Sequence, residues 1–313
     1  MYEGRAPVEA GLIFGHENMG VIEAVGSAVR NVKVGDRVVL PFNIGCGFCF
    51  NCTRGFSNAC LTVNPQGHGG GYGYSGMGPH PGGQAELVRV PYADYNALAL
   101  PGTPGDEFED DFILLADVFP TGYHATEQAH VKPGDTVAIF GAGPVGLMAA
   151  LSCKSVQDLQ KGAGEKMPGV MCTIDAIGYE AKKHDTGDRK NEGQQDPEQL
   201  LADLVRLTNP TGHISLIGVY FPEDPGAKGD AKKGRFLLDL GDAWNKGITI
   251  EMGQAPVKQY NVYLRDLIIA GVAKPSTIVS HRFPLDGAVD AYKNFDARND
   301  GYTKVLLKPQ QAA

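Results

Sequence analysis

The chain has 313 residues and a formal net charge of −8 at pH 7, which leaves room for two domains of about 150 residues each. Hydrophobic residues make up 42% of the sequence, but no apolar run approaches the roughly 18 residues that a membrane span needs, so a membrane protein is not expected. The basic residues are scattered apart from a short run of Lys232, Lys233 and Arg235, which argues against a surface for nucleic acid.

The N-terminal stretch "MYEGRAPVEAGLIFGHE" has neither the basic flank nor the apolar core of a secretory signal. We therefore expect a cytoplasmic protein in a reducing compartment, where clustered cysteines are metal ligands before they are disulfides. The stretch "FGHENMGVIEAVGSAVRNVKVGDRVVL" alternates apolar and polar residues between turn signals. This pattern predicts antiparallel strands of a barrel-like domain, with His16 and Glu17 at their head.

Four of the six cysteines lie within "CGFCFNCTRGFSNAC", with the spacing C-x2-C-x2-C-x7-C. Two-residue spacers let consecutive thiolates turn toward one centre, and the longer loop returns the fourth, so the pattern favours a closed, structural zinc site. An iron–sulfur cluster has similar spacings and stays an alternative. The expected ligands are Cys46, Cys49, Cys52 and Cys60, whereas Cys153 and Cys172 lie in apolar contexts and are expected in the core.

A glycine-rich turn follows the apolar segment Val137–Phe140 and carries Gly141, Gly143 and Gly146 in the spacing G-x-G-x-x-G. The segment "PVGLMAALSC" then begins a helix. The strand, the glycine turn and the helix together predict a site for a dinucleotide pyrophosphate. Such a motif calls for an acidic residue at the end of a strand about 20 residues further on. The stretch "KSVQDLQKGAGEKMPG" is too polar for a strand, so pattern alone makes Asp175, at the end of "GVMCTID", the ribose carboxylate.

Downstream, further strands are expected at His213–Ile217 and Ile248–Glu251, and a helix at about Pro197 to Thr208. The charged stretch "AKKHDTGDRKNEGQQDPEQL" is expected to be a solvated loop leading into that helix.

The chain resembles the zinc-dependent medium-chain alcohol dehydrogenase family, in its formaldehyde-dehydrogenase-like branch. Matching segments run in family order and include "GHENMGVIEAVG", "VKVGDRVVLPFNIGCGFCFNC", "LADVFPTGYHAT", "GAGPVGLMAA", "IDAIGYEA" and "YTKVLLKP". The resemblance implies an α/β fold class: a GroES-like β-barrel catalytic domain (1–130) with a structural zinc lobe, a truncated Rossmann doubly wound parallel sheet (131–275), and a C-terminal return to the catalytic domain (276–313).

The resemblance also implies site residues. It makes His16 a catalytic zinc ligand, Glu17 a neighbour that can exchange onto the metal, and Asp117 a further ligand in the place of the more usual cysteine. In the family another cysteine ligand lies upstream of the segment matching "MYEGRAP", and no cysteine precedes Cys46 here. The cofactor contacts that the resemblance implies are Gly141, Gly143, Val145, Gly146, Ile177, Lys182, His184, Val219, Gly253 and Ala255.

By the same resemblance "VMCTIDAIGYEA" matches the fourth strand of the cofactor domain rather than the second. A block of about 40 residues, the second βα unit and the third strand, is then missing between Cys153 and Lys154. The ribose carboxylate is expected to be missing with it.

The function implied is hydride transfer between an alcohol or aldehyde hydrate and NAD(H), assisted by Zn²⁺. The cofactors expected are therefore zinc and NAD, and the partners a small alcohol or aldehyde and a second copy of the chain along the edge near Ile248–Glu251. One alternative is a catalytically silent paralogue, or an incomplete gene model, that keeps only the structural zinc site. A zinc-free reductase is disfavoured by the cysteine lobe.

Overall fold

The computed structural model describes residues 8, 10–157, 169–183, 194–297, 299 and 301–309. These residues form two compact units: unit 1 is Thr121–Ala255, and unit 2 combines Val8–Pro120 with the described residues from Pro256 onward. The boundaries between the units fall near residues 120 and 255, whereas the sequence analysis expected them near residues 130 and 275. The second boundary comes earlier because helix α8 (Val257–Ile269) packs on unit 2 elements.

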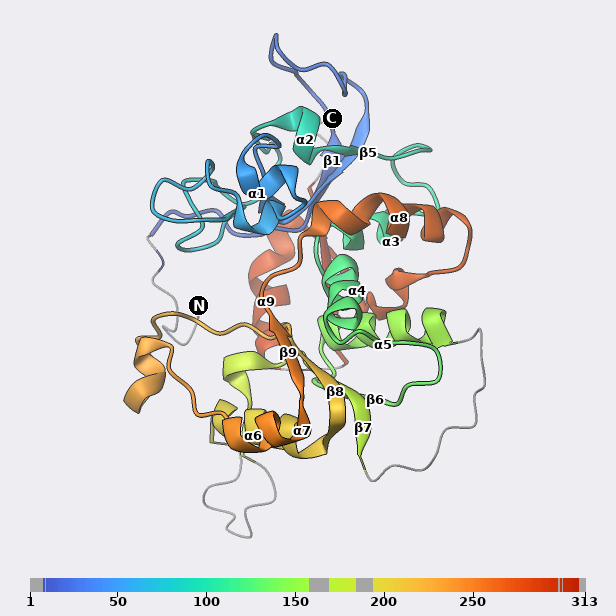
Figure 1. The fold of residues 1–313 in the computed structure, drawn as a ribbon. Helices are drawn as coiled ribbons and strands as arrows, with labels where there is room; N and C mark the ends of the chain where they lie inside the picture. Colours follow the sequence, from blue (N-terminus) through green and yellow to red (C-terminus); the bar gives the residue numbers. More distant parts are fainter. Residues whose placement is uncertain are drawn as a thin grey trace. The chain divides into compact units, whose positions relative to one another are not determined.

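Unit 2 is built from short strands and helices joined by long loops (Figure 1). Its strands are β1 (Asn18–Val21), β2 (Arg37–Leu40), β3 (Asn43–Ile44), β4 (Gly70–Gly71), β5 (Leu98–Ala99), β10 (His281–Pro284) and β11 (Val305–Lys308). Its α-helices are α1 (Phe50–Thr53), α2 (Ala93–Asn96), α3 (Glu109–Phe112), α8 and α9 (Ala288–Asp296). Its 3₁₀ turns are η1 (Ser57–Ala59), η2 (Ile113–Ala116), η5 (Pro275–Ile278) and η6 (Leu285–Gly287).

The predicted antiparallel strands are present as β1 and β2, which pair from Asn18 opposite Leu40 to Val21 opposite Arg37, with β5 on the other side of β2. All four residues of β2 are buried. The guanidinium of Arg37 is buried as well, and it is held by a two-pronged ion pair with Asp106 at 2.8 and 3.0 Å. Burying a cation is costly unless it is paired and hydrogen-bonded, so this pair fixes the loop after β5.

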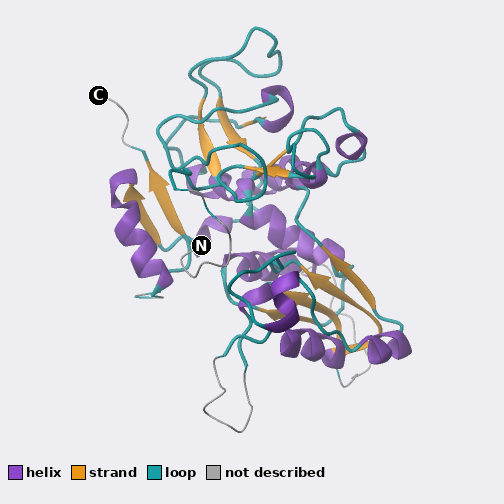
Figure 2. Cartoon of the chain, turned by 90° about the vertical axis from the view of Figure 1, so that its left-hand side faces the viewer, coloured by secondary structure: helices purple, strands orange, loops and turns teal. Residues whose placement is uncertain are grey.

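Unit 1 contains a four-stranded parallel sheet and its covering helices, shown as orange arrows and purple ribbons in Figure 2. The strands are β6 (Val137–Phe140), β7 (Val170–Asp175), β8 (Thr208–Leu216) and β9 (Thr249–Met252), hydrogen-bonded in the order β6-β7-β8-β9. The helices are α4 (Val118–Gln128), which begins in unit 2, α5 (Pro144–Gln157), α6 (Pro197–Leu207) and α7 (Leu240–Lys246), with 3₁₀ turns η3 (Gly178–Glu180) and η4 (Gly229–Lys233).

The two faces of this sheet bury separate apolar clusters. On one face, alanines of α4 and α5 pack against Cys172 and Ile174 of β7. On the other face, leucines of α6 pack against Ile214 of β8 and Ala243 of α7. Parallel strands with helices on both faces give the doubly wound α/β architecture expected from the sequence. Cys153 and Cys172 are buried, as predicted.

Local chemistry explains where α6 begins and ends. The side chain of Asp196 accepts a hydrogen bond from the backbone N–H of Gln199, and Pro197 occupies the first helical position, both of which favour a helix start. At the other end, Lys246 Nζ donates to the backbone carbonyls of Val205, Arg206 and Thr208. Among the helices that the structure describes, none is long and apolar enough to cross a membrane.

Candidate active site, metal lobe and cofactor edge

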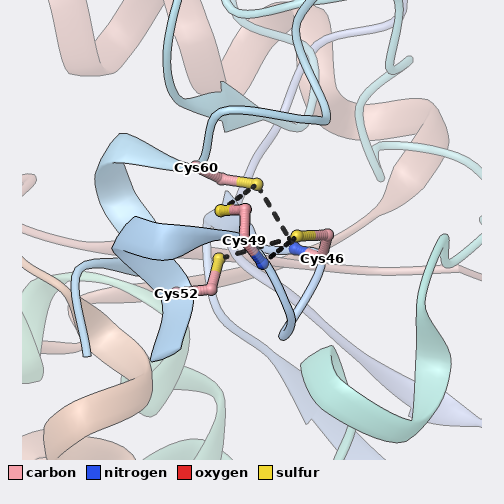
Figure 3. A group of neighbouring side chains, drawn as sticks. All are labelled: Cys46, Cys49, Cys52 and Cys60. Atoms are coloured by element: carbon pink, nitrogen blue, oxygen red, sulfur yellow. Dashed lines mark hydrogen bonds between the residues drawn. The ribbon is translucent and has the colours of Figure 1, made fainter. Parts of the chain in front are cut away.

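The four predicted cysteines converge on one point (Figure 3). Cys46 follows β3, Cys49 and Cys52 lie at the start and inside of α1, and Cys60 follows η1. The sulfurs of Cys46 and Cys52 are 4.0 Å apart, and those of Cys49 and Cys60 are 3.9 Å apart. These separations are far longer than a disulfide bond, and they are close to the ~3.8 Å edge of a tetrahedron with metal–sulfur bonds of about 2.3 Å. The lobe fits a closed, four-sulfur zinc site.

Backbone amides in the lobe point at the sulfurs. The N–H of Cys49 donates to Cys46 Sγ at 3.3 Å, and that of Leu61 donates to Cys49 Sγ at 3.5 Å. Burial on its own raises a thiol pKa, but for Cys49 the hydrogen bonds from the backbone of Leu61 and Cys52, together with those of the neighbouring thiols, outweigh it and hold the pKa at about 6. At Cys52 burial prevails and raises the pKa to about 12. Amide donors stabilise thiolate, the form that binds metal.

Two glycines let the loop close tightly around the cysteines. A Cβ at Gly47, whose φ is +85°, would lie 2.7 Å from the ring of Tyr95, and one at Gly45 would lie 2.6 Å from the same ring. The ring of Tyr95 therefore covers the lobe at a distance that only glycine allows.

A second group of possible metal ligands consists of His16, Glu17 and Asp117, one ligand atom of each lying within 4.8 Å of the others. His16 and Glu17 immediately precede β1, and Asp117 lies between η2 and α4. His16 Nε2 is 2.8 Å from Asp117 Oδ2. Because β1 and η2 are in contact, the packing of unit 2 brings together residues that are 101 positions apart. The sequence predicted this grouping from the family resemblance.

The surroundings of this group suit a cation. Burial lowers the pKa of His16, but the hydrogen bond and charge of Asp117, together with the charge of Glu17, outweigh burial and raise it. Glu17 Oε2 is buried, and among the described residues it has no hydrogen-bond partner. An orphaned carboxylate oxygen beside a histidine and a second carboxylate is the donor set that zinc accepts, so these residues fit a zinc ion.

One residue of the site was missed by the sequence analysis. Lys304, directly before β11, donates from Nζ to Glu17 Oε1. Its segment, "YTKVLLKP", resembles the family but carries no motif of its own. No local signal could have marked Lys304, because its partner lies 287 positions away.

The glycine turn after β6 has the geometry of a phosphate-binding loop. Gly141 has a φ of +110°, and a Cβ at Gly146 would lie only 1.9 Å from the carbonyl oxygen of Gly141. In contrast, a Cβ at Gly143 would meet nothing within 4 Å. The turn leads directly into α5 at Pro144, and the first backbone amides of a helix have no partner within the helix. This arrangement fits a pyrophosphate.

Three further predicted cofactor contacts follow the ends of the other strands. Ile177 comes after β7, Val219 after β8 and Gly253 directly after β9. Because the strands are parallel, these loops share the carboxyl edge of the sheet with the glycine turn, which is where α/β sheets bind nucleotides. The backbone N–H of Tyr179 donates to the Val219 carbonyl at 3.0 Å, which ties two of the loops together.

The remaining predicted cofactor residues are placed differently. Val145 lies in the first turn of α5, and Lys182 forms an isolated backbone bridge with Gln195. The side chain of Ala255 is fully buried. His184 lies outside the described residues.

Asp175 is not available to a ribose, so the interpretation from pattern alone was wrong. Its side chain is fully buried. Oδ1 accepts the backbone N–H groups of Ile177 at 2.8 Å and Gly178 at 2.9 Å, and Oδ2 accepts the hydroxyl of Tyr220 at 3.0 Å. Burial raises the pKa of Asp175, although these hydrogen bonds oppose it. Its role is to brace the turn after β7.

Comparisons with known proteins agree with this geometry. A family model described as the alcohol dehydrogenase GroES-like domain matches residues 1–102. A glutathione-independent formaldehyde dehydrogenase of Pseudomonas aeruginosa is 38% identical over 335 positions, covering 95% of this chain and 83% of the relative. One of Bacillus subtilis is 36% identical over 334 positions, covering 95% and 80%. The solved structure of an alcohol dehydrogenase from Thermus sp. ATN1 matches with a TM-score of 0.78 at 29% identity, covering 99% of this chain and 87% of that one.

The first of these alignments also measures a difference in length. Its 335 positions exceed the 95% of 313 residues, about 297, that this chain contributes. The Pseudomonas enzyme therefore has about 38 residues inside the aligned region that have no counterpart here. This excess is similar in size to the block of about 40 residues that the sequence analysis expects to be missing. On identity, coverage and fold, the chain belongs to the zinc-dependent medium-chain alcohol dehydrogenase family, in its formaldehyde-dehydrogenase-like branch.

Proposed function

We propose that the chain oxidises a small primary alcohol or an aldehyde hydrate, with transfer of hydride to a nicotinamide cofactor, at a zinc site made by His16, Glu17 and Asp117. The observation that carries the proposal is the convergence of one donor atom from each of these residues within 4.8 Å. It favours an enzyme over a chain that keeps only the cysteine lobe. The formaldehyde dehydrogenases among the relatives support a one-carbon or similarly small substrate.

Each residue has a distinct part in this proposal. When bound, zinc supplies a Lewis acid for the substrate oxygen, and the nicotinamide accepts the hydride. His16 and Asp117 would hold the metal from two different segments. Glu17 offers its unpartnered oxygen while Lys304 holds the other one. Phe42 and Tyr74 pack edge-on against the His16 ring at 5.7 and 6.0 Å, and they fix its orientation.

The test compares metal content and activity in matched variants. Protein loaded with zinc should contain two zinc ions per chain and form NADH from NAD⁺ with formaldehyde or a short alcohol. His16→Ala should lose one zinc ion and at least about a hundredfold in kcat/KM. His68→Ala removes an exposed histidine of the same unit and should change neither. One zinc ion in the unmodified chain, with no NADH formed from any substrate of the series, would refute the proposal.

Association and location are also part of the proposal. Strand β9 ends the sheet order, and Met252 on it and Trp244 on α7 are 67% and 82% exposed. These features support pairing of two copies along β9. Sedimentation equilibrium tests this, and a monomer mass at all concentrations would contradict it.

All six cysteines are free, which supports a reducing compartment, the cytoplasm. Recovery of the tagged chain in a secreted or periplasmic fraction would contradict this location.

A further inference from the structure

The order of the strands in unit 1 identifies which half of a nucleotide-binding sheet is present. In a complete two-halved sheet the spatial order is 3-2-1-4-5-6, and the glycine turn follows strand 1. Here the glycine turn follows β6, so β6 is strand 1. If β7 and β8 were strands 2 and 3, β9 would pair with β6. It pairs with β8 instead, His213 lying opposite Thr249 and Leu216 opposite Met252. Strands β7, β8 and β9 are therefore strands 4, 5 and 6.

In the part of the chain that the structure describes, the other edge of β6 is consequently open, because no strand pairs with β6 except β7. Strands 2 and 3 would lie at this open edge, and strand 2 would end in the carboxylate that accepts the ribose hydroxyls of the adenosine half. The roughly 38 residues by which the Pseudomonas enzyme exceeds this chain in the aligned region would suffice for two such strands and their connection.

No described group takes over the role of that carboxylate. Asp175, the acidic residue at the end of the next strand, is buried and holds the turn after β7 through three hydrogen bonds. A cavity of about 630 Å³ lies beside β6, and its lining runs from Asp135 and Thr136 before the strand to Ile139 within it. It includes no residue of the phosphate turn that begins at Gly141.

The nicotinamide half of the site is retained. The glycine turn leaves open space at Gly143, and the loops after β7, β8 and β9 stand at the same edge of the sheet. In such folds the pyrophosphate lies at the glycine turn and the nicotinamide lies on the side of strands 4 to 6.

We propose that this chain recognises nicotinamide nucleotides through the nicotinamide mononucleotide half and the pyrophosphate turn, and that the adenosine half adds little to binding. The proposal rests on the proposed function, because it concerns the cofactor of that same reaction. Two consequences distinguish it from an ordinary dehydrogenase. The reduced mononucleotide NMNH should bind nearly as well as NADH, and a 2′-phosphate should make little difference, so NADPH should bind like NADH.

The test is equilibrium binding, which does not depend on turnover. Zinc-loaded protein is titrated with NADH, NADPH and NMNH by calorimetry, with AMP as a competitor. We expect the three dissociation constants to lie within about tenfold of each other, and AMP to leave them unchanged at millimolar concentration. A charged hydrogen bond to the ribose is worth about tenfold or more in affinity, so NADH binding more than about tenfold tighter than NMNH, or displacement by AMP, overturns the proposal.

Two variants locate the site. Gly143→Asp puts a carboxylate into the open space of the phosphate turn, and it should weaken NADH and NADPH by at least about tenfold through charge repulsion. Lys154→Gln is the control: it removes an exposed cation of α5 that lines the cavity beside β6, away from the phosphate turn, and it should change none of the three constants. Selective weakening of NADPH by Lys154→Gln would place the adenosine half beside that cavity and contradict the proposal.

The outcomes also separate this inference from the proposed function. Binding of NADH more than about tenfold tighter than NMNH refutes only the proposal that the adenosine half adds little to binding, and the proposed dehydrogenase activity still stands. Failure of folded, zinc-loaded protein to bind any of the three nucleotides refutes both.

Discussion

The ammonium group of Lys304 pairs with Glu17 across 287 positions of the chain. Both side chains are largely buried, with 13% and 21% of their surface exposed. The pair fixes the start of β11 against the segment that carries His16, and it occupies one of the two carboxylate oxygens that a metal ion could use. Lys304 is therefore a competitor of the metal for Glu17.

Removing this competitor should strengthen zinc binding at the site of His16 and Asp117. In Lys304→Met the carboxylate is released and a nearby positive charge is lost, so the second zinc equivalent should bind roughly three- to tenfold more tightly. Titration against a chromogenic chelator measures this. Lys304→Arg keeps the charge and is the matched control, expected to bind like the unmodified chain. Weaker zinc binding in Lys304→Met would show that the ion pair supports the site instead.

The cysteine lobe should hold its metal independently of the other site. Cys46→Ser removes one of four sulfur ligands, so the protein should lose one zinc ion and about 3 kcal/mol or more of unfolding free energy. Cys153→Ser, at a buried cysteine outside the lobe, should keep all its zinc while losing about 1–3 kcal/mol for burying a hydroxyl. Metal analysis beside thermal unfolding separates the two. Equal zinc content in both variants would contradict a four-sulfur site.

Substitution by alanine should have different effects on stability at Gly146 and at Gly143 of the phosphate turn. At Gly146 the added methyl would lie 1.9 Å from the Gly141 carbonyl, and we expect a loss of about 2–3 kcal/mol in unfolding free energy. At Gly143 it would meet nothing within 4 Å, so the loss should stay under about 1 kcal/mol. Chemical denaturation of Gly146→Ala and Gly143→Ala compares them. Similar destabilisation of both would mean that the turn adopts another conformation.

Stability should depend on pH through His124 of α4. Burial, partly opposed by the charge of Glu251, lowers the pKa of His124 from 6.5 to about 4. Between these values the unfolded chain binds the proton and the folded chain does not, so unfolding free energy rises with pH across this window and is flat below it. The contribution is on the order of 3 kcal/mol. His124→Gln should show a correspondingly flatter profile between pH 4 and 6.5 in denaturant titrations; an unchanged slope would contradict the assignment.

The features that could be read from the sequence were those set by neighbouring residues. The spacing of Cys46 to Cys60 is a local property, and it predicted the lobe. The apolar segment before Gly141 and the helix after it were likewise found where the pattern placed them. The strands at the ends of the sheet lie within a residue of their expected bounds, because a short run of β-branched residues between turn signals is itself local.

The features that could not be read depend on how distant segments pair. Spacing identified Asp175 as the end of a strand, but the position of that strand in the sheet, and hence the role of its carboxylate, depended on pairing with β8. Lys304 had no local signal because its partner is far away in sequence. The sequence analysis expected the second unit boundary near residue 275, whereas it lies at Ala255. Helix α8 is amphipathic and would suit either unit, and its packing on α3 and η2 assigns it to unit 2.

The interruption of unit 2 by unit 1 has a consequence for biosynthesis. A ribosome completes unit 1 when it reaches Ala255, while unit 2 still lacks α8, β10 and β11. Domains generally fold as units as they emerge, so the parallel sheet can form first, and His16 and Glu17 must wait for Lys304. The first half of unit 2 then spends this interval with its four cysteines already synthesised, and zinc captured by the nascent lobe would protect them from oxidation until the C-terminal segment arrives.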